Sequence, residues 1–244
     1  MGRIRMKFVL DTHTHTLASG HSYSTIREMA HTAAERGLQL LGITEHAPKM
    51  PGSCHELYFQ NLKVVDRQMC GVELLLGAEL NILSPDGTVD LPDSILQKLD
   101  ITIASLHIPC MKPGTLLENT RAYVNAIKNP LINIIGHPDD RRYPVDYKEI
   151  VLAAKEYDTL IELNNASLTD GGARVNARPL DIELLELCKE YEVPIVVASD
   201  AHIHLAVGNH DQAESLLEEL HFPEHLIVNQ DANYLKKYVN RYKR

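Results

Sequence analysis

The chain has 244 residues, of which 44% are hydrophobic and 23% are charged, a composition typical of a folded globular protein. Its formal net charge of -9 argues against a broad nucleic-acid or anionic-membrane surface, because such surfaces bind through clustered positive charge. No apolar stretch approaches the roughly 20 residues of a membrane span, and the first residues lack the apolar centre of a signal peptide. We therefore expect a cytoplasmic protein with a single domain over residues 1–244.

Short apolar runs alternate with helical patterns along most of the chain. Seven runs are rich in Val, Ile and Leu, and their near-continuous apolarity is typical of strands buried on both faces. We expect strands at 7–11, 38–45, 73–79, 100–107, 131–137, 159–164 and 194–200. We expect helices at 24–36, 57–69, 116–128, 147–157, 180–191, 212–220 and 233–244. This alternation predicts an α/β fold with a parallel sheet.

Histidines and carboxylates follow six of the seven predicted strands. In chain order they are His13, His15 and His21, then Glu45 and His46, then Glu79, His107, His137, Asp200 and His202. In a parallel barrel the carboxyl ends of all strands meet at one rim, where such enzymes place their active sites. An open doubly wound sheet would not bring its edge strands to one point. The pattern therefore favours a barrel.

The residue types at these strand ends indicate a metal site. A single histidine at a strand end is more often simply hydrogen-bonded, and the remaining histidines lie dispersed in predicted helices and loops. Isolated hydrogen bonds do not explain why seven histidines, together with carboxylates, gather at the ends of six strands. Imidazole and carboxylate ligands together suit zinc, with manganese or iron as alternatives, whereas calcium and magnesium favour oxygen ligands alone.

The sequence also resembles the PHP (polymerase and histidinol phosphatase) superfamily, and within it the small bacterial YcdX-like phosphatases. The resembling segments are Asp11-Thr12-His13-Thr14-His15, His21, Gly42-Ile43-Thr44-Glu45-His46, Gly77-Ala78-Glu79, His107, Gly136-His137-Pro138, Glu162-Leu163-Asn164-Asn165 and Ser199-Asp200-Ala201-His202. They run through most of the chain in the order of the family. The resemblance implies a distorted TIM-like (βα)7 barrel that holds up to three divalent metal ions, usually zinc.

The resemblance also implies which residue binds which ion. His13 and His15 would bind the first metal with Asp200, Glu79 would bridge the first and second, and His107 and His137 would complete the second. His21, His46 and His202 would bind the third. One departure is Glu45, where the family commonly has Asp before the histidine; the longer side chain could shift the third metal if it supports His46.

The expected chemistry is hydrolysis of a small phosphomonoester by a metal-bound hydroxide at this trinuclear cluster. A carboxylate such as Glu79 can hold two cations about 3.5 to 4 Å apart, close enough to share one water. We assign catalytic roles to Glu79, Asp200 and His202. Candidate substrate-binding residues are Arg141, Arg142 and Arg174, which could clamp phosphate, and Asn164 at a strand end. Gly171-Gly172 indicates a loop beside the rim that could act as a lid.

Three other functions compete with phosphomonoester hydrolysis. The same cluster could hydrolyse phosphodiesters or nucleotides, although the acidic charge favours a small ligand. An amidohydrolase also carries a His-x-His pair after its first strand, but those with two metals usually bridge them with a carbamylated lysine, and no lysine ends a predicted strand here. A non-catalytic metal-braced PHP domain is the third, because fold does not guarantee activity.

Overall fold

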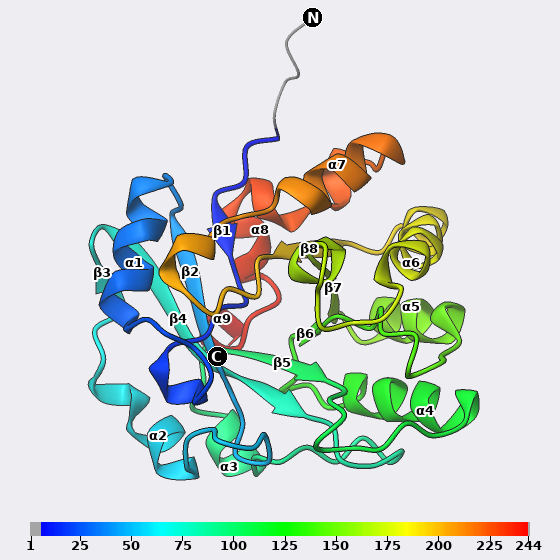
Figure 1. The fold of residues 1–244 in the computed structure, drawn as a ribbon, viewed down its shortest axis with the longest axis horizontal. Helices are drawn as coiled ribbons and strands as arrows, with labels where there is room; N and C mark the ends of the chain where they lie inside the picture. Colours follow the sequence, from blue (N-terminus) through cyan, green and yellow to red (C-terminus); the bar gives the residue numbers. More distant parts are fainter. Residues whose placement is uncertain (1–5, 244) are drawn as a thin grey trace, which may run out of the picture.

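The computed structural model describes residues 6–243, and Figure 1 shows its strands surrounded by a ring of helices. Seven parallel strands follow one another in the order β1-β2-β4-β5-β6-β7-β8, and β3 pairs antiparallel with β4. The strands are β1 Leu10–Asp11, β2 Leu40–His46, β3 Gln68–Met69, β4 Val72–Asn81, β5 Ile101–Ser105, β6 Ile134–Ile135, β7 Leu160–Asn164 and β8 Ile195–Ala198. This topology confirms the predicted seven-stranded barrel.

Strands β1 and β8 close the barrel only loosely. Past the two strands, Thr14 and Ala201 form an isolated parallel bridge in which the His15 amide donates to the Ala201 carbonyl at 2.9 Å. At the other end, the side-chain amide of Asn229 donates to the carbonyls of Leu10 and Val197 at 3.2 and 2.7 Å. One buried asparagine therefore supplies hydrogen bonds that a continuous strand pair would otherwise make.

The helices match most of the predicted positions. They are α1 Ile26–Glu35, α2 Glu56–Asn61, α3 Asp93–Leu96, α4 Leu116–Ile127, α5 Tyr147–Glu156, α6 Ala177–Tyr191, α7 Asp211–Glu219, α8 Ala232–Lys236 and α9 Asn240–Lys243. Short 3-10 helices are η1 Leu17–Ser19, η2 Leu62–Val64, η3 Ala166–Leu168, η4 His204–Ala206, η5 Glu224–Leu226 and η6 Val228–Gln230. Capping boxes begin α1 at Thr25, with Glu28, and α4 at Thr115, with Glu118.

The helix expected at 57–69 is wrong in its second half. Helix α2 ends at Asn61, and the Arg67 guanidinium donates to the carbonyls of Leu62 and Val65 at 2.6 and 2.8 Å, so these groups do not continue a helix. The chain then turns through Cys70 and Gly71, both with positive φ, from β3 into β4. Two left-handed residues in a row are the signature of a two-residue hairpin turn.

The C-terminal helix expected at 233–244 is instead two short helices, α8 and α9, within the described residues. The Asn133 side chain donates to the Tyr238 carbonyl and to Asn240 Oδ1, each at 2.9 Å. These hydrogen bonds hold the segment at which α8 has ended and α9 begins. This segment lies near the centre of the ring in Figure 1. It contributes Leu235 and Val239 to the core inside the barrel.

Two separate hydrophobic cores hold the barrel together. The larger one packs the outer faces of the strands against the surrounding helices. The inner one takes side chains from each of the seven parallel strands, namely Leu10, Leu40, Leu75, Ile101, Ile103, Ile134, Leu160 and Val196, and is plugged by Val228, Leu235 and Val239. The barrel interior is thus filled with apolar side chains below its rim. Over residues 6–243, no helix is long and apolar enough to cross a membrane.

Candidate metal centre

The candidate ligands continue the inner faces of the barrel strands. Side chains on a strand alternate between its two faces, so an inward Leu75 places Glu79, four residues later, on the inner face as well. His107 and Asp200 lie two residues beyond the carboxyl ends of β5 and β8, the strands that carry inward Ile103 and Val196. The apolar filling of the barrel therefore gives way to candidate ligands at the carboxyl ends of the strands.

Four overlapping groups of side chains bring ligand atoms within 4.8 Å of one another. They are His13, His15 and Asp200; His13, Glu79 and His137; His46, Glu79 and His107; and His15, His46 and His202. Glu79 belongs to two of these groups, and its Oε1 lies 2.7 Å from His137 Nε2 and 3.1 Å from His107 Nε2. This position between histidines is where a bridging carboxylate would lie.

Five buried atoms in this cluster make no hydrogen bond of good geometry, although some of them lie close together, such as His46 Nδ1 and Glu79 Oε2 at 2.6 Å. They are His13 Nε2, His15 Nε2, His46 Nδ1, Glu79 Oε2 and Asp200 Oδ1. Buried polar atoms are normally satisfied, and leaving one unpaired costs about 1–3 kcal/mol. Five such atoms gathered in one place, each a nitrogen or carboxylate oxygen, fit divalent cations of the zinc type.

Hydrogen bonds to the opposite ring nitrogen orient several of the histidines. His13 Nδ1 lies 2.7 Å from Glu162 Oε1, and His107 Nδ1 lies 2.8 Å from Asn81 Oδ1. His202 Nδ1 lies 3.0 Å from the Asp200 carbonyl oxygen. With Nδ1–H donating to these oxygens, Nε2 carries the lone pair that a metal ligand requires.

The charged groups of the cluster shift one another's pKa values. Burial favours the neutral form of Glu79, but His107, His13 and His46 outweigh it and hold the pKa of Glu79 well below its ordinary value. Burial opposes a charge on His13, but Glu162, Glu79 and Asp200 hold the pKa of His13 well above its ordinary value. The carboxylates therefore stay ionised, as cation ligands must be, and a metal ion bound at His13 Nε2 would displace the proton that the raised pKa favours.

Two candidate ligands sit at strained backbone positions. His137 has a φ of 31° and Asp200 a φ of 54°, in the left-handed region that side chains other than glycine seldom adopt. The His137 amide is held there by Glu162 Oε2 at 2.8 Å. Strain of this kind persists where surrounding contacts enforce it, and it concentrates at functional sites.

Of the three predicted ligand sets, only that of His13, His15 and Asp200 coincides with one of the four groups above, and His21 belongs to none of these groups among the described residues. The His21 ring lies 4.8 Å from that of His46 and 4.9 Å from that of His202, between centroids. His46 also reaches inward, with Nδ1 2.6 Å from Glu79 Oε2. His46 thus lies between the second and third predicted positions, and the ligand assignment to individual ions stays a prediction.

Glu45 is the residue that departs from the family pattern. Its side chain forms hydrogen bonds to the loop before His21 and does not contact the His46 ring directly. Its carboxylate accepts from the Ser19 hydroxyl at 2.6 Å and from the Thr16 amide at 3.0 Å, and Tyr58 donates to it at 3.3 Å. Ser19 Oγ in turn accepts from the His46 amide at 3.0 Å. The longer side chain is therefore used to hold the 3-10 turn that separates His15 from His21.

A cavity of about 290 Å³ opens above the cluster. It is lined by candidate ligands, by the apolar residues Met50, Leu106, Ile108 and Pro109, and by Asp140, Arg142, Ala173 and Arg174. Of the four predicted substrate-binding residues, Arg142 and Arg174 line it. Arg141 is exposed and is not among the lining residues. Asn164 is buried and donates to Asp200 Oδ2 at 3.2 Å, so it positions a candidate ligand.

Arg174 is a largely buried cation at the site. Its side chain is 12% exposed, and Nη2 lies 2.9 Å from Asp200 Oδ2. Although burial opposes its charge, Asp200, Asp139, Glu79 and Glu162 raise its pKa above the ordinary value. A permanently charged guanidinium at the wall of a metal-side cavity is suited to binding a phosphate group.

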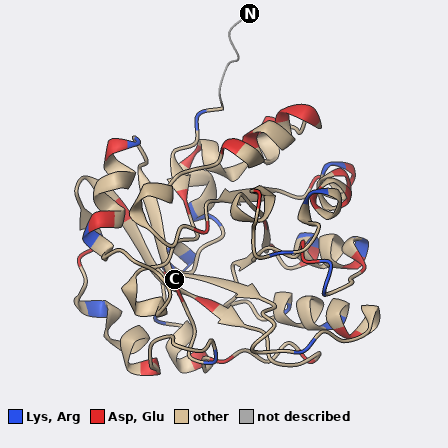
Figure 2. Cartoon of the chain, viewed as in Figure 1, with Lys and Arg blue, Asp and Glu red and all other residues tan. Residues whose placement is uncertain are grey.

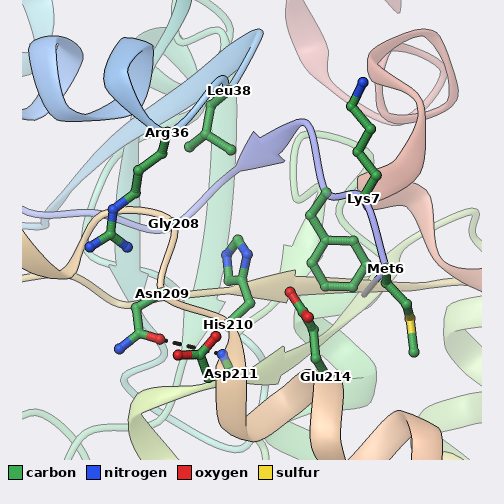
Figure 3. Close-up of a pocket in the computed structure, with 10 residues that line it drawn as sticks. Met6, Lys7, Arg36, Leu38, Gly208, Asn209, His210, Asp211 and Glu214 are labelled. Atoms are coloured by element: carbon green, nitrogen blue, oxygen red, sulfur yellow. Dashed lines mark hydrogen bonds between the residues drawn. The ribbon is translucent and has the colours of Figure 1, made fainter. Parts of the chain in front are cut away.

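A second cavity, of about 550 Å³, lies away from the cluster (Figure 3). It is formed by the segment before β1, the end of α1 and the start of α7, with Lys7, Arg36, Asp211 and Glu214 among its lining residues. It shares no lining residue with the smaller cavity among the residues the structure describes. Of the nine candidate ligands, none lines this larger cavity, and six line the smaller one: His21, His46, His107, His137, Asp200 and His202.

Sequence reasoning gave no role to Glu162 and Asn81. Both lie on the inner faces of strands, and each contacts a histidine far away in sequence. Glu162 stood in a segment that carried the family resemblance, but nothing in its spacing indicated His13 as its partner.

Comparison with known proteins identifies the family. A family model described as the PHP domain matches residues 11–228. The chain belongs to the PHP-domain family. It is 46% identical over 234 residues to a probable phosphatase of Clostridium novyi, covering 96% of this chain and 95% of that one. It is 48% identical over 239 residues to a probable phosphatase of Caldanaerobacter subterraneus, and this match covers 98% of this chain and 93% of that one.

A solved structure shows the same fold. The histidinol phosphate phosphatase of Lactococcus lactis, in complex with zinc, L-histidinol and phosphate, aligns with a TM-score of 0.60 and 21% identity. The alignment covers 88% of this PHP protein and 94% of that chain. The family and the barrel inferred from the sequence are therefore confirmed.

Proposed function

We propose that this PHP protein is a metal-dependent phosphatase that hydrolyses a small phosphomonoester. The observation that carries the proposal is that five buried nitrogen and carboxylate oxygen atoms, none with a well-formed hydrogen bond, gather beside Arg174 and a cavity of about 290 Å³. Full-length relatives more than 45% identical are named probable phosphatases, and the structural neighbour binds zinc and phosphate. All of these point to the same reaction class.

The proposed cofactor is a set of three divalent ions, with zinc favoured and manganese or iron as alternatives. His13, His15 and Asp200 would hold the first, Glu79 with His107 and His137 the second, and His21, His46 and His202 the third. Such ions, when bound, act as Lewis acids and lower the pKa of water toward neutrality. The mixed nitrogen and oxygen donors support this choice over calcium or magnesium.

The protein's own residues would orient and neutralise the phosphate. Asp200 offers Oδ1 to the cluster because Arg174 and Asn164 already engage Oδ2 at 2.9 and 3.2 Å. Arg174, on the cavity wall, is placed to bind phosphate oxygens and offset their charge. His202, also on that wall, keeps Nε2 free because Nδ1 lies 3.0 Å from a carbonyl oxygen. We assign Glu79, Asp200 and His202 to catalysis on these grounds.

The competing functions receive less support. No lysine is found among the described residues that line the cavity, which weighs against an amidohydrolase with a carbamylated lysine. In Figure 2, basic and acidic segments are interspersed over the helices, and the drawn ribbon presents no continuous basic band to a nucleic-acid polymer in this view. A purely structural metal site would not need the cavity or Arg174.

Three alanine variants test the proposal. His13→Ala, Glu79→Ala and Asp200→Ala should each abolish metal-dependent release of phosphate from small monoesters. The matched control is His225→Ala, because His225 is an exposed histidine that faces Glu192 at 4.0 Å, and its removal should leave activity unchanged. Full activity in all three variants would contradict the proposal.

A further inference from the structure

Arg142 joins two loops at the rim, through an ion pair within its own loop and a hydrogen bond to the other loop. Arg142, after β6, donates from Nε to both carboxylate oxygens of Asp140 at 2.9 Å, and from Nη2 to Asp140 Oδ2 at 2.5 Å. The same Nη2 donates to the carbonyl of Ala173, in the loop after η3, at 2.9 Å. Arg142 therefore ties a turn of its own loop to the backbone of a neighbouring loop.

Hydrogen bonds from the Arg141–Arg142 segment hold the backbone on both sides of Arg174. Ala173 precedes Arg174 and is bound by Arg142, while the Val175 carbonyl accepts from the Arg141 amide at 3.1 Å. The Val175 amide also points at Asp140 Oδ1, at 3.5 Å. The only residue between these anchors is Arg174, whose guanidinium reaches inward to Asp200.

Arg142 and Arg174 therefore differ in how many of their N–H groups remain available to bind a phosphate. The Arg142 side chain is 41% exposed, and its Nε and Nη2 already donate to protein oxygens, so a phosphate would have to replace those contacts. The Arg174 side chain is 12% exposed, and within residues 6–243 its guanidinium makes one hydrogen bond, from Nη2 to Asp200, so its other N–H groups remain for a phosphate. A bidentate arginine–carboxylate pair is rigid and geometrically specific, which suits it to fixing a loop.

We propose that Asp140 and Arg142 are positioning residues that fix the 173–175 backbone and so hold Arg174 over the metal centre, and that Arg142 does not itself contact the phosphate. This rests on the proposed function, in which Arg174 binds phosphate. The sequence analysis named Arg142 as a candidate phosphate-binding residue; in this proposal Arg142 instead supports Arg174, which binds the phosphate. A lysine could not replace it, because a single ammonium lacks the planar fork that spans Asp140 and Ala173.

The test measures binding of inorganic phosphate to the metal-loaded full-length protein by calorimetry, with kcat and KM for a small phosphomonoester alongside. Arg142→Gln and Asp140→Asn should each weaken phosphate binding about tenfold, because Arg174 would no longer be held in place and its charged hydrogen bond to the phosphate would be lost. Arg142→Lys should not restore binding. Arg174→Gln should weaken binding at least as much, and adding Arg142→Gln to it should cause no further loss.

A matched control separates support from general damage. Arg178→Gln removes another arginine paired with a carboxylate, that of exposed Glu219 at 2.5 Å, and should leave phosphate binding unchanged. Additive losses in the Arg142→Gln/Arg174→Gln double variant, or rescue by Arg142→Lys, would overturn the inference and place Arg142 on the phosphate. A wild-type protein that releases no phosphate from esters but shows the non-additive pattern would overturn the proposed function alone. A metal-loaded wild-type protein that binds no phosphate would overturn both.

Discussion

His13 Nδ1 lies 2.7 Å from Glu162 Oε1, and both side chains are fully buried. The two residues are 149 positions apart, one beyond β1 and the other on β7. Their contact directs His13 Nε2 toward Asp200 and Glu79, whose nearest oxygens lie 3.6 and 3.5 Å away. A carboxylate behind a ligand histidine fixes the ring and raises its basicity.

Replacing this carboxylate should weaken metal binding. Glu162→Gln keeps the shape of the side chain but removes its charge, and we expect metal affinity at the first position to fall roughly 10- to 100-fold. Competition with a chelator, read by metal content, measures the change. Glu219→Gln, at an exposed glutamate, is the control. Equal affinity in Glu162→Gln and wild type would show that the contact does not support the ligand.

Shortening Glu45 should affect the third metal position first. Glu45→Asp restores the residue common in the family but withdraws the carboxylate from Ser19 and Tyr58, which loosens the turn before His21. We expect a stability loss of about 1–3 kcal/mol and earlier loss of one metal equivalent during chelation. Stepwise chelation followed by mass spectrometry resolves the order. Simultaneous loss of all metal would contradict the link between this turn and the third position.

Asp181 should destabilise the protein at alkaline pH. Burial, and then repulsion from Asp139, raise its pKa well above the ordinary value, while burial raises the pKa of Asp139 to about 6. A raised folded-state pKa means that the folded protein holds protons more tightly than the unfolded chain, so stability falls as pH rises from about 4 through the folded-state pKa values.

Asp181→Asn removes this cost, and its free energy of unfolding should exceed that of wild type by about 1–3 kcal/mol at pH 8. The gain should shrink toward pH 4, where the wild-type pair is protonated. Urea unfolding at both pH values measures it, with Glu156→Gln on the exposed end of α5 as control. A variant less stable than wild type at pH 8 would refute the prediction.

The cavity should discriminate substrates by charge. Two carboxylates line it, Asp140 and Asp200, and each is bonded to an arginine, so neither is available to an ammonium group. Among two-carbon monoesters, ethyl phosphate and phosphoglycolate should therefore have kcat/KM values about tenfold above that of phosphoethanolamine, a difference of about 1.4 kcal/mol. Steady-state assays with the three esters measure this. Preference for phosphoethanolamine would mean that an arginine releases its carboxylate on binding.

The sequence was sufficient to predict the barrel and the rim at which the candidate ligands gather. Apolar runs ending in His13, Glu79 or Asp200 make that rim predictable, because parallel strands must end on the same side of a barrel. The turn at Cys70-Gly71 was missed because only glycine gave a local signal for a left-handed pair. Arg142 and Arg174 could not be distinguished, because which arginine faces inward depends on contacts between loops that are remote from each other in sequence.

The measurement that tests the central claim most directly is metal content determined together with phosphatase activity on one preparation. The protein is stripped with a chelator and then titrated with zinc, manganese or iron(II). We predict that the stripped protein releases no phosphate from small monoesters and that activity returns as metal binds, saturating at three equivalents. Undiminished phosphate release by the metal-free protein would contradict the account.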